Sequence, residues 1–91
     1  MRKFASVWDA LEDSTDAAES MKARAAIMMR IEKVVRRWEV PQSEAARRLG
    51  ITQPRVNDLI RGRVDKFSLD SLFDLAAHAG LKVSLAIRRA A

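Results

Sequence analysis

One stretch, residues 42–62, constrains the fold of this chain more than any other. Its apolar residues recur with the period of two short helices joined by a tight turn. They are Ala45, Ala46, Leu49, Ile51, Val56, Leu59 and Ile60. Helices that cross closely need a small residue at the crossing, which Ala46 provides, and the turn needs a glycine able to adopt a positive φ, which Gly50 provides. The pattern therefore predicts a helix-turn-helix in which Gln42 opens the first helix and Thr52 starts the second.

Further helices are predicted on both sides of this motif. Residues 15–38 form one amphipathic pattern without glycine or proline, and Thr15 is a suitable N-cap. The apolar positions of this pattern step by three or four residues, at Met21, Ala25, Met28, Ile31, Val35 and Trp38. Another helix is expected over residues 68–79, capped by Ser68, and a short one over residues 4–11. Together with the two helices of the motif, this gives five.

The length and composition indicate a single small domain. The chain has 91 residues, enough for one modest core. It has no cysteine, so it forms no disulfide and no cysteine-ligated zinc site. No apolar run is long enough to span a membrane, and the first residues lack the apolar core of a signal peptide. We therefore expect a soluble cytoplasmic protein.

Charge is unevenly distributed along the chain. Residues 1–20 carry two basic and five acidic side chains, a balance of −3, whereas residues 21–91 carry 15 basic and 7 acidic ones, a balance of +8. Such an excess suits a domain that binds a polyanion, because each lysine or arginine that meets a phosphate releases a condensed counterion. Arg55, Arg61 and Arg63 lie in or just after the second helix of the motif. A basic helix-turn-helix domain points to double-stranded DNA as the ligand.

Enzymatic function and RNA binding are both disfavoured by the residues available. The one histidine, His78, falls in the last turn of a predicted helix, and there is no cysteine, so no nucleophile–base set or metal cluster is found. Glu12 and Asp13 are adjacent in sequence and so point in different directions on a helix. There is no tyrosine, and few aromatic residues are available for base stacking. We expect no catalytic residue, no metal and no cofactor.

Residues 81–87 follow a different period. Leu81, Val83, Leu85 and Ile87 alternate with polar or small residues, which predicts a half-buried β-strand. A strand needs a neighbour for its backbone groups. Two neighbours are open: residues 2–7 of the same chain, or the same segment of a second subunit, paired antiparallel across a two-fold axis. We favour the second, because helix-turn-helix proteins commonly need a dimer to span two half-sites.

The run QSEAARRLGITQPRVNDLIRG at residues 42–62, followed by FSLDSL at residues 67–72, resembles the Xre/Cro repressor family. Within that family the chain is similar to the HigA-type antitoxins, which are encoded beside a ribonuclease toxin, and residues 7–30 look like the leader of that subgroup. The resemblance implies an all-α, five-helix fold of the lambda-repressor type, with a leader at residues 1–14 that is a short helix or extended, and the helix-turn-helix domain at residues 15–91. The short C-terminal strand would then be paired across a dimer.

The resemblance also implies which side chains read the bases. Gln53 is the best base reader, because glutamine pairs bidentately with adenine. Arg55 is expected to meet guanine or a phosphate, and Asn57 a base edge in the same groove. Pro54 departs from the family pattern, since many relatives carry a polar base reader there and proline offers only an apolar face. Asp58 either accepts from a cytosine amine or pairs with Arg55 or Arg61.

Contacts to the DNA backbone are implied for a second set of residues. Gln42 and Thr52 open the two helices of the motif and would contact phosphates. The sequence-independent attraction is assigned to Arg47, Arg48, Arg61 and Arg63.

Together these features predict a homodimeric, nucleoid-associated repressor of a near-palindromic operator, with half-site centres about 34 Å apart. The resemblance makes it the antitoxin of a bacterial type II toxin–antitoxin pair that represses its own operon. The acidic stretch at residues 9–19 would suit the basic surface of a small ribonuclease. The alternative is a stand-alone Xre-type regulator without a toxin partner, and the neighbouring reading frame distinguishes the two.

Overall fold

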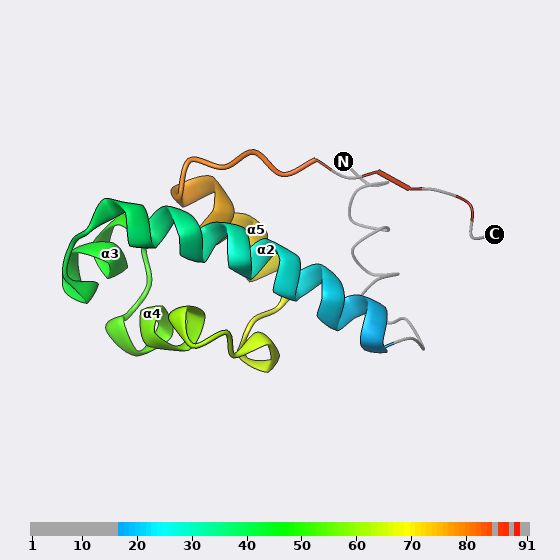
Figure 1. Cartoon of the computed structure of the whole chain (residues 1–91), viewed down its shortest axis with the longest axis horizontal. Helices are drawn as coiled ribbons and strands as arrows, with labels where there is room; N and C mark the ends of the chain where they lie inside the picture. Colours follow the sequence, from blue (N-terminus) through cyan, green and yellow to red (C-terminus); the bar gives the residue numbers. More distant parts are fainter. Residues whose placement is uncertain (1–16, 85, 88, 90–91) are drawn as a thin grey trace.

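The computed structural model describes residues 17–84, 86, 87 and 89 of the chain (Figure 1). Within these residues lie four α-helices: α2 (Ala17–Trp38), α3 (Gln42–Leu49), α4 (Gln53–Ile60) and α5 (Leu69–His78). A 3-10 turn, η1 (Val64–Lys66), connects α4 to α5. The long helix α2 crosses the molecule, and α5, η1 and α4 pack against it, while α3 packs against α4 and α5.

Helix α2 is stabilised by its charge placement and by one apolar side. Glu19 lies in the first turn and Arg36 and Arg37 in the last, where each sign of charge interacts favourably with the helix dipole. The helix ends at Trp38, as predicted. Three residues of the predicted apolar stripe are buried, namely Met28, Ile31 and Val35. Met21, at the start of that stripe, is exposed.

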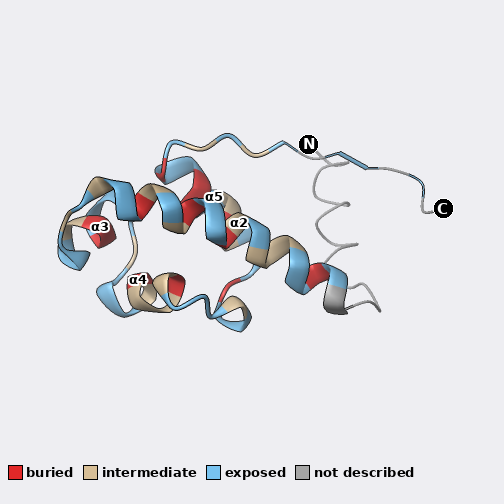
Figure 2. Cartoon of the chain, in the orientation of Figure 1, coloured by how far each residue is buried: buried red, intermediate tan, exposed pale blue. Residues whose placement is uncertain are grey.

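The core is assembled from side chains of all four described helices. Ile31 of α2, Leu59 of α4 and Leu72 of α5 are fully buried, and Leu49 of α3 is 1% exposed. In Figure 2 the buried positions lie on the sides of the helices that face one another. Burial of one such side chain contributes roughly 1.5–3 kcal/mol. The two helices of the motif are therefore held by the same core that joins α2 to α5.

The prediction of five helices is wrong for the part of the chain that the structure describes, which contains four. The helix expected over residues 4–11, the cap at Thr15 and the leader at residues 1–14 all lie outside the described residues. No described helix is long and apolar enough to cross a membrane.

The predicted C-terminal strand is also wrong. Among the described residues after α5, namely 81–84, 86, 87 and 89, none belongs to a strand. Leu81 and Val83 are half-buried and pack against the core of their own chain, whereas Ile87 is 71% exposed. Leu85 lies outside the described residues. An alternating pattern also suits an extended segment that lays every second side chain on a core, and without a neighbouring strand its backbone has no ladder to join.

Candidate nucleic-acid interface

The turn between α3 and α4 has the geometry that a helix-turn-helix requires. Gly50 has φ 71° and ψ 29°, in the left-handed region. Its N–H donates to the carbonyl of Arg47 at 3.3 Å, and the N–H of Ile51 donates to the carbonyl of Ala46 at 3.0 Å. This pair of hydrogen bonds is a Schellman motif, which ends α3 and turns the chain sharply. The roles predicted for Gly50 and Ile51 are confirmed.

Helix α4 begins with a capped first turn. The hydroxyl of Thr52 accepts from the N–H of Arg55 at 3.4 Å, and the carbonyl of Thr52 accepts from the N–H of Val56 at 3.0 Å. Pro54 follows within the first turn, where a missing N–H removes no helical hydrogen bond. Thr52, Gln53 and Pro54 are all exposed. The N-terminal end of α4 therefore lies open to solvent, and the helix dipole there favours an anion.

One flank of α4 presents polar side chains that are not engaged by the protein. Val56 and Leu59 are fully buried and fix which side of the helix faces the core. Gln53, Asn57 and Arg61 follow one another at intervals of four residues, which places them along one flank. Gln53 and Arg61 are exposed and Asn57 is half-buried, and none of these side chains has a hydrogen bond or ion pair within the described chain. Their donors and acceptors remain available to a ligand.

Arg55, the other predicted base reader, is held by the protein itself. Its Nη1 donates to the carbonyl of Lys66 at 2.7 Å. Its guanidinium carbon lies 4.2 Å from the centre of the Phe67 ring, within the range of a cation–π contact. Arg55 therefore differs from Gln53 and Asn57, because its charged group already has partners in the segment that leads to α5.

The loop after α4 is closed by a second Schellman motif. Gly62 has φ 70°, its N–H donates to the carbonyl of Leu59 at 3.1 Å, and the N–H of Arg63 donates to the carbonyl of Asp58 at 3.0 Å. The side chains of Arg63 and Asp58 form an ion pair, with Nε 3.8 Å from Oδ1. Asp58 therefore pairs with Arg63 and not with Arg55 or Arg61. The side chain of Lys66 is exposed and has no ion pair among the described residues.

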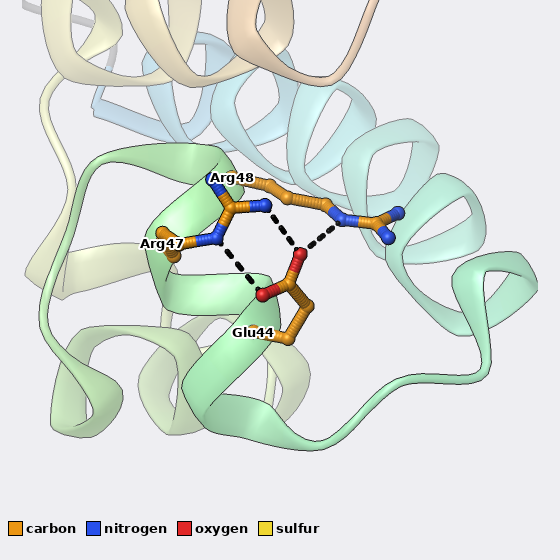
Figure 3. Close-up of polar contacts among 3 residues, drawn as sticks. All are labelled: Glu44, Arg47 and Arg48. Carbon is orange, nitrogen blue, oxygen red and sulfur yellow. Dashed lines mark hydrogen bonds and ion pairs between the residues drawn. The ribbon is translucent and has the colours of Figure 1, made fainter.

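Two predicted backbone cations, Arg47 and Arg48, converge on one carboxylate (Figure 3). Arg47 binds Glu44 through both oxygens, at 2.9 Å and 2.6 Å, and Nε of Arg48 donates to Glu44 at 2.9 Å. These hydrogen bonds, from Arg47 first and then Arg48, lower the pKa of Glu44 to about 2, and the same contact raises the pKa of Arg47. Arg48 also lies over the ring of Trp38, 5.1 Å from its centre. Nε and Nη2 of Arg47 and Nε of Arg48 are therefore already engaged by Glu44, and these donors reach a phosphate only by leaving it.

Gln42 is exposed at the first position of α3. It borders a shallow hollow together with Ile60, the last residue of α4. The start of α3 and the end of α4 therefore lie beside each other, which brings Gln42 near the segment that carries Arg61.

The sequence reasoning missed Glu44, Lys66 and Phe67. Glu44 was recognisable, because its spacing of three and four residues from Arg47 and Arg48 allows ion pairs along a helix. Lys66 and Phe67 act on Arg55 from the other side of a loop, and no local spacing indicates such a contact. Within the described residues no group of three His, Asp or Glu side chains is placed to hold a metal ion. The ring of His78 instead meets the carbonyl of Asp74, with Nδ1 at 2.9 Å.

The comparison with known protein families agrees with this geometry. Residues 10–88 match a family described as a helix-turn-helix domain, and the match includes the turn at Gly50 and the whole polar flank of α4. No curated protein matches the chain.

Proposed function

Because the chain belongs to a helix-turn-helix domain family, the class of domain that binds DNA, we propose that it is a sequence-specific transcriptional repressor whose α4 enters the major groove. One observation carries this proposal: the side chains of Gln53, Asn57 and Arg61 form an unengaged polar flank on a helix whose other side is fully buried.

Within this proposal, base reading rests on Gln53 and Asn57. Both amides offer a paired donor and acceptor, which matches the N6 and N7 edge of adenine, and each good pairing contributes roughly 1–3 kcal/mol of discrimination. Gln42, Thr52 and Arg61 contact phosphates around the groove. Arg63, Arg47 and Arg48 contribute less in this scheme, because each has an acidic partner within the protein.

We further propose that the protein binds a near-palindromic operator as a homodimer, with the two α4 helices about one DNA turn, or 34 Å, apart. The short length of α4 supports the dimer. A helix of eight residues reads only a few base pairs, so two copies are needed to specify a longer operator. Sedimentation with and without operator DNA tests the stoichiometry. A single protomer on a non-repeated site would contradict the dimer and leave the role of α4 intact.

The direct test measures binding to the DNA upstream of the chain's own reading frame, and to random DNA of the same length, at two salt concentrations. Gln53→Ala should relax the preference at one base position per half-site. Arg61→Ala should weaken both DNAs alike and flatten the salt dependence by about 0.9 per bound protomer in the slope of log K against log salt. Arg36→Ala is the matched control, because Arg36 is an exposed arginine paired with Glu32 on α2, outside the motif. Equal losses on both DNAs for Gln53→Ala would remove its assignment as a base reader.

A finer proposal is that the repressor is the antitoxin of a toxin–antitoxin pair. Its support is the similarity to HigA-type antitoxins and the five acidic side chains within residues 9–19. A small ribonuclease would present a basic surface to such a segment. The test is whether the product of the adjacent reading frame co-purifies with this chain. Co-purification should be lost in a variant in which Asp9, Glu12 and Asp13 are changed to lysine. If no small basic protein is encoded beside this chain, a stand-alone regulator is the better description.

A further inference from the structure

The segment between α4 and α5 is tied back to α4 near both of its ends. At its start, the N–H and the side chain of Arg63 both meet Asp58, at 3.0 Å and 3.8 Å. At its end, Arg55 hydrogen-bonds the Lys66 carbonyl at 2.7 Å and lies over the ring of Phe67. Between them, the N–H of Lys66 donates to the carbonyl of Arg63 at 3.0 Å. Residues 61–67, which we call the cation loop, are therefore held in one conformation relative to α4.

Phe67 provides a rigid support for the guanidinium of Arg55. Its side chain is 2% exposed and belongs to the core, so its ring has a fixed position against which the guanidinium can stack. A planar guanidinium that stacks on a ring and donates to a carbonyl is fixed in its plane as well as in its position. To use Nη1 on guanine or a phosphate, Arg55 would first have to give up its bond to the Lys66 carbonyl, and a large reorientation of the guanidinium would cost the ring contact as well.

We propose that Arg55 is a positioning residue that fixes the cation loop beside α4, and not a base reader. This inference rests on the proposed function, since it assigns the loop to DNA binding. Arg61 and Lys66, which are exposed and unpaired within the described chain, are then displayed at set positions next to the polar flank. A loop ordered before binding loses less conformational entropy when it meets the phosphates.

The first test needs no DNA. Hydrogen exchange is measured at the amides of Lys66 and Phe67 in the intact protein, in Arg55→Ala and in Arg55→Lys. Both variants should exchange faster by about an order of magnitude, because a hydrogen bond from a charged donor and a cation–π contact are lost or weakened. Arg61→Ala is the matched control and should leave these amides unchanged. Unchanged exchange in Arg55→Ala would overturn the proposal, and circular dichroism confirms that each variant is folded.

The second test separates positioning from direct contact with DNA. Arg55→Ala should weaken the operator and random DNA by the same factor and leave the preference at every base position unchanged. Arg55→Lys should not restore affinity, because lysine keeps the charge but lacks the planar fork that stacks on Phe67. Rescue by lysine would mean a phosphate contact, and a lost preference at one base position would mean a base contact, so either result contradicts positioning. If the intact protein binds no DNA, the proposed function fails while the exchange result still stands.

Discussion

Replacing Gly50 with alanine tests the turn on which the whole interface depends. A Cβ at this position would lie 3.7 Å from Nε2 of His78, which is ordinary van der Waals contact, so steric overlap adds nothing to the cost. The cost comes from the backbone, because φ is 71° and an L-residue in this region is less stable by roughly 1–2 kcal/mol. The lower freedom of alanine in the unfolded chain offsets about 0.4–1 kcal/mol. The net loss should be about 1 kcal/mol.

Urea and thermal unfolding measure this loss, which corresponds to a fall in Tm of roughly 4–8 °C for a domain of this size. Gly62→Ala is the matched control, since Gly62 has φ 70° and no atom within 4 Å of the added Cβ. The two substitutions should therefore cost about the same stability. If Gly50→Ala is neutral while Gly62→Ala is destabilising, the turn does not have the left-handed conformation described, and the orientation of α4 derived from it is wrong.

Three further substitutions probe other parts of the fold. Glu39→Gly should raise the free energy of unfolding, measured in urea, by up to about 1 kcal/mol, because Glu39 has φ 50° and glycine removes that strain. A fall in this free energy would contradict the strain assigned to Glu39. Leu59→Ala should lower the free energy of unfolding by about 2–5 kcal/mol, since Leu59 is fully buried; a loss below 1 kcal/mol would show that α4 is not anchored by this side chain. Glu44 has its pKa lowered from 4.5 to about 2, so its pairs with Arg47 and Arg48 stabilise the fold above pH 4.5 and are lost as the pH falls towards 2. Acid titration of stability should be flatter over that range in Glu44→Gln, and an unchanged curve would contradict the pairing.

The parts of the fold that were predicted correctly are those that neighbouring residues determine. Ser68 caps α5 as predicted, and Thr52, which was expected to start the second helix of the motif, caps α4; an N-cap bond joins residues only three positions apart. The left-handed glycines after α3 and α4 were predictable for the same reason, since a Schellman motif closes within six residues. The buried sides of α3 and α4 follow from helical periodicity, which decides the orientation of the polar flank once the turn is known.

The C-terminal segment shows where this local reasoning ends. The alternation at Leu81 and Val83 correctly indicates that these side chains face a core. It does not indicate what the backbone does, because strand formation depends on a partner that the sequence of the segment does not contain. The period of two therefore predicts which side chains are buried. The prediction of a strand also required a neighbouring strand, and the described chain does not contain one.

The same distinction applies to the charges of the interface. Four arginines were assigned to the DNA backbone by their position in the motif, but three of them have an acidic partner: Arg47 and Arg48 share Glu44, and Arg63 pairs with Asp58. A cation that already has a partner gains less from a phosphate than a free one, because it must exchange one ion pair for another. Arg61 is the member of this set without such a partner in the described chain. The number of arginines in and around the motif therefore overstates how many cations are free to attract phosphates. In the repressor proposed above, a smaller attraction to random DNA would leave the choice of site to the polar flank of α4.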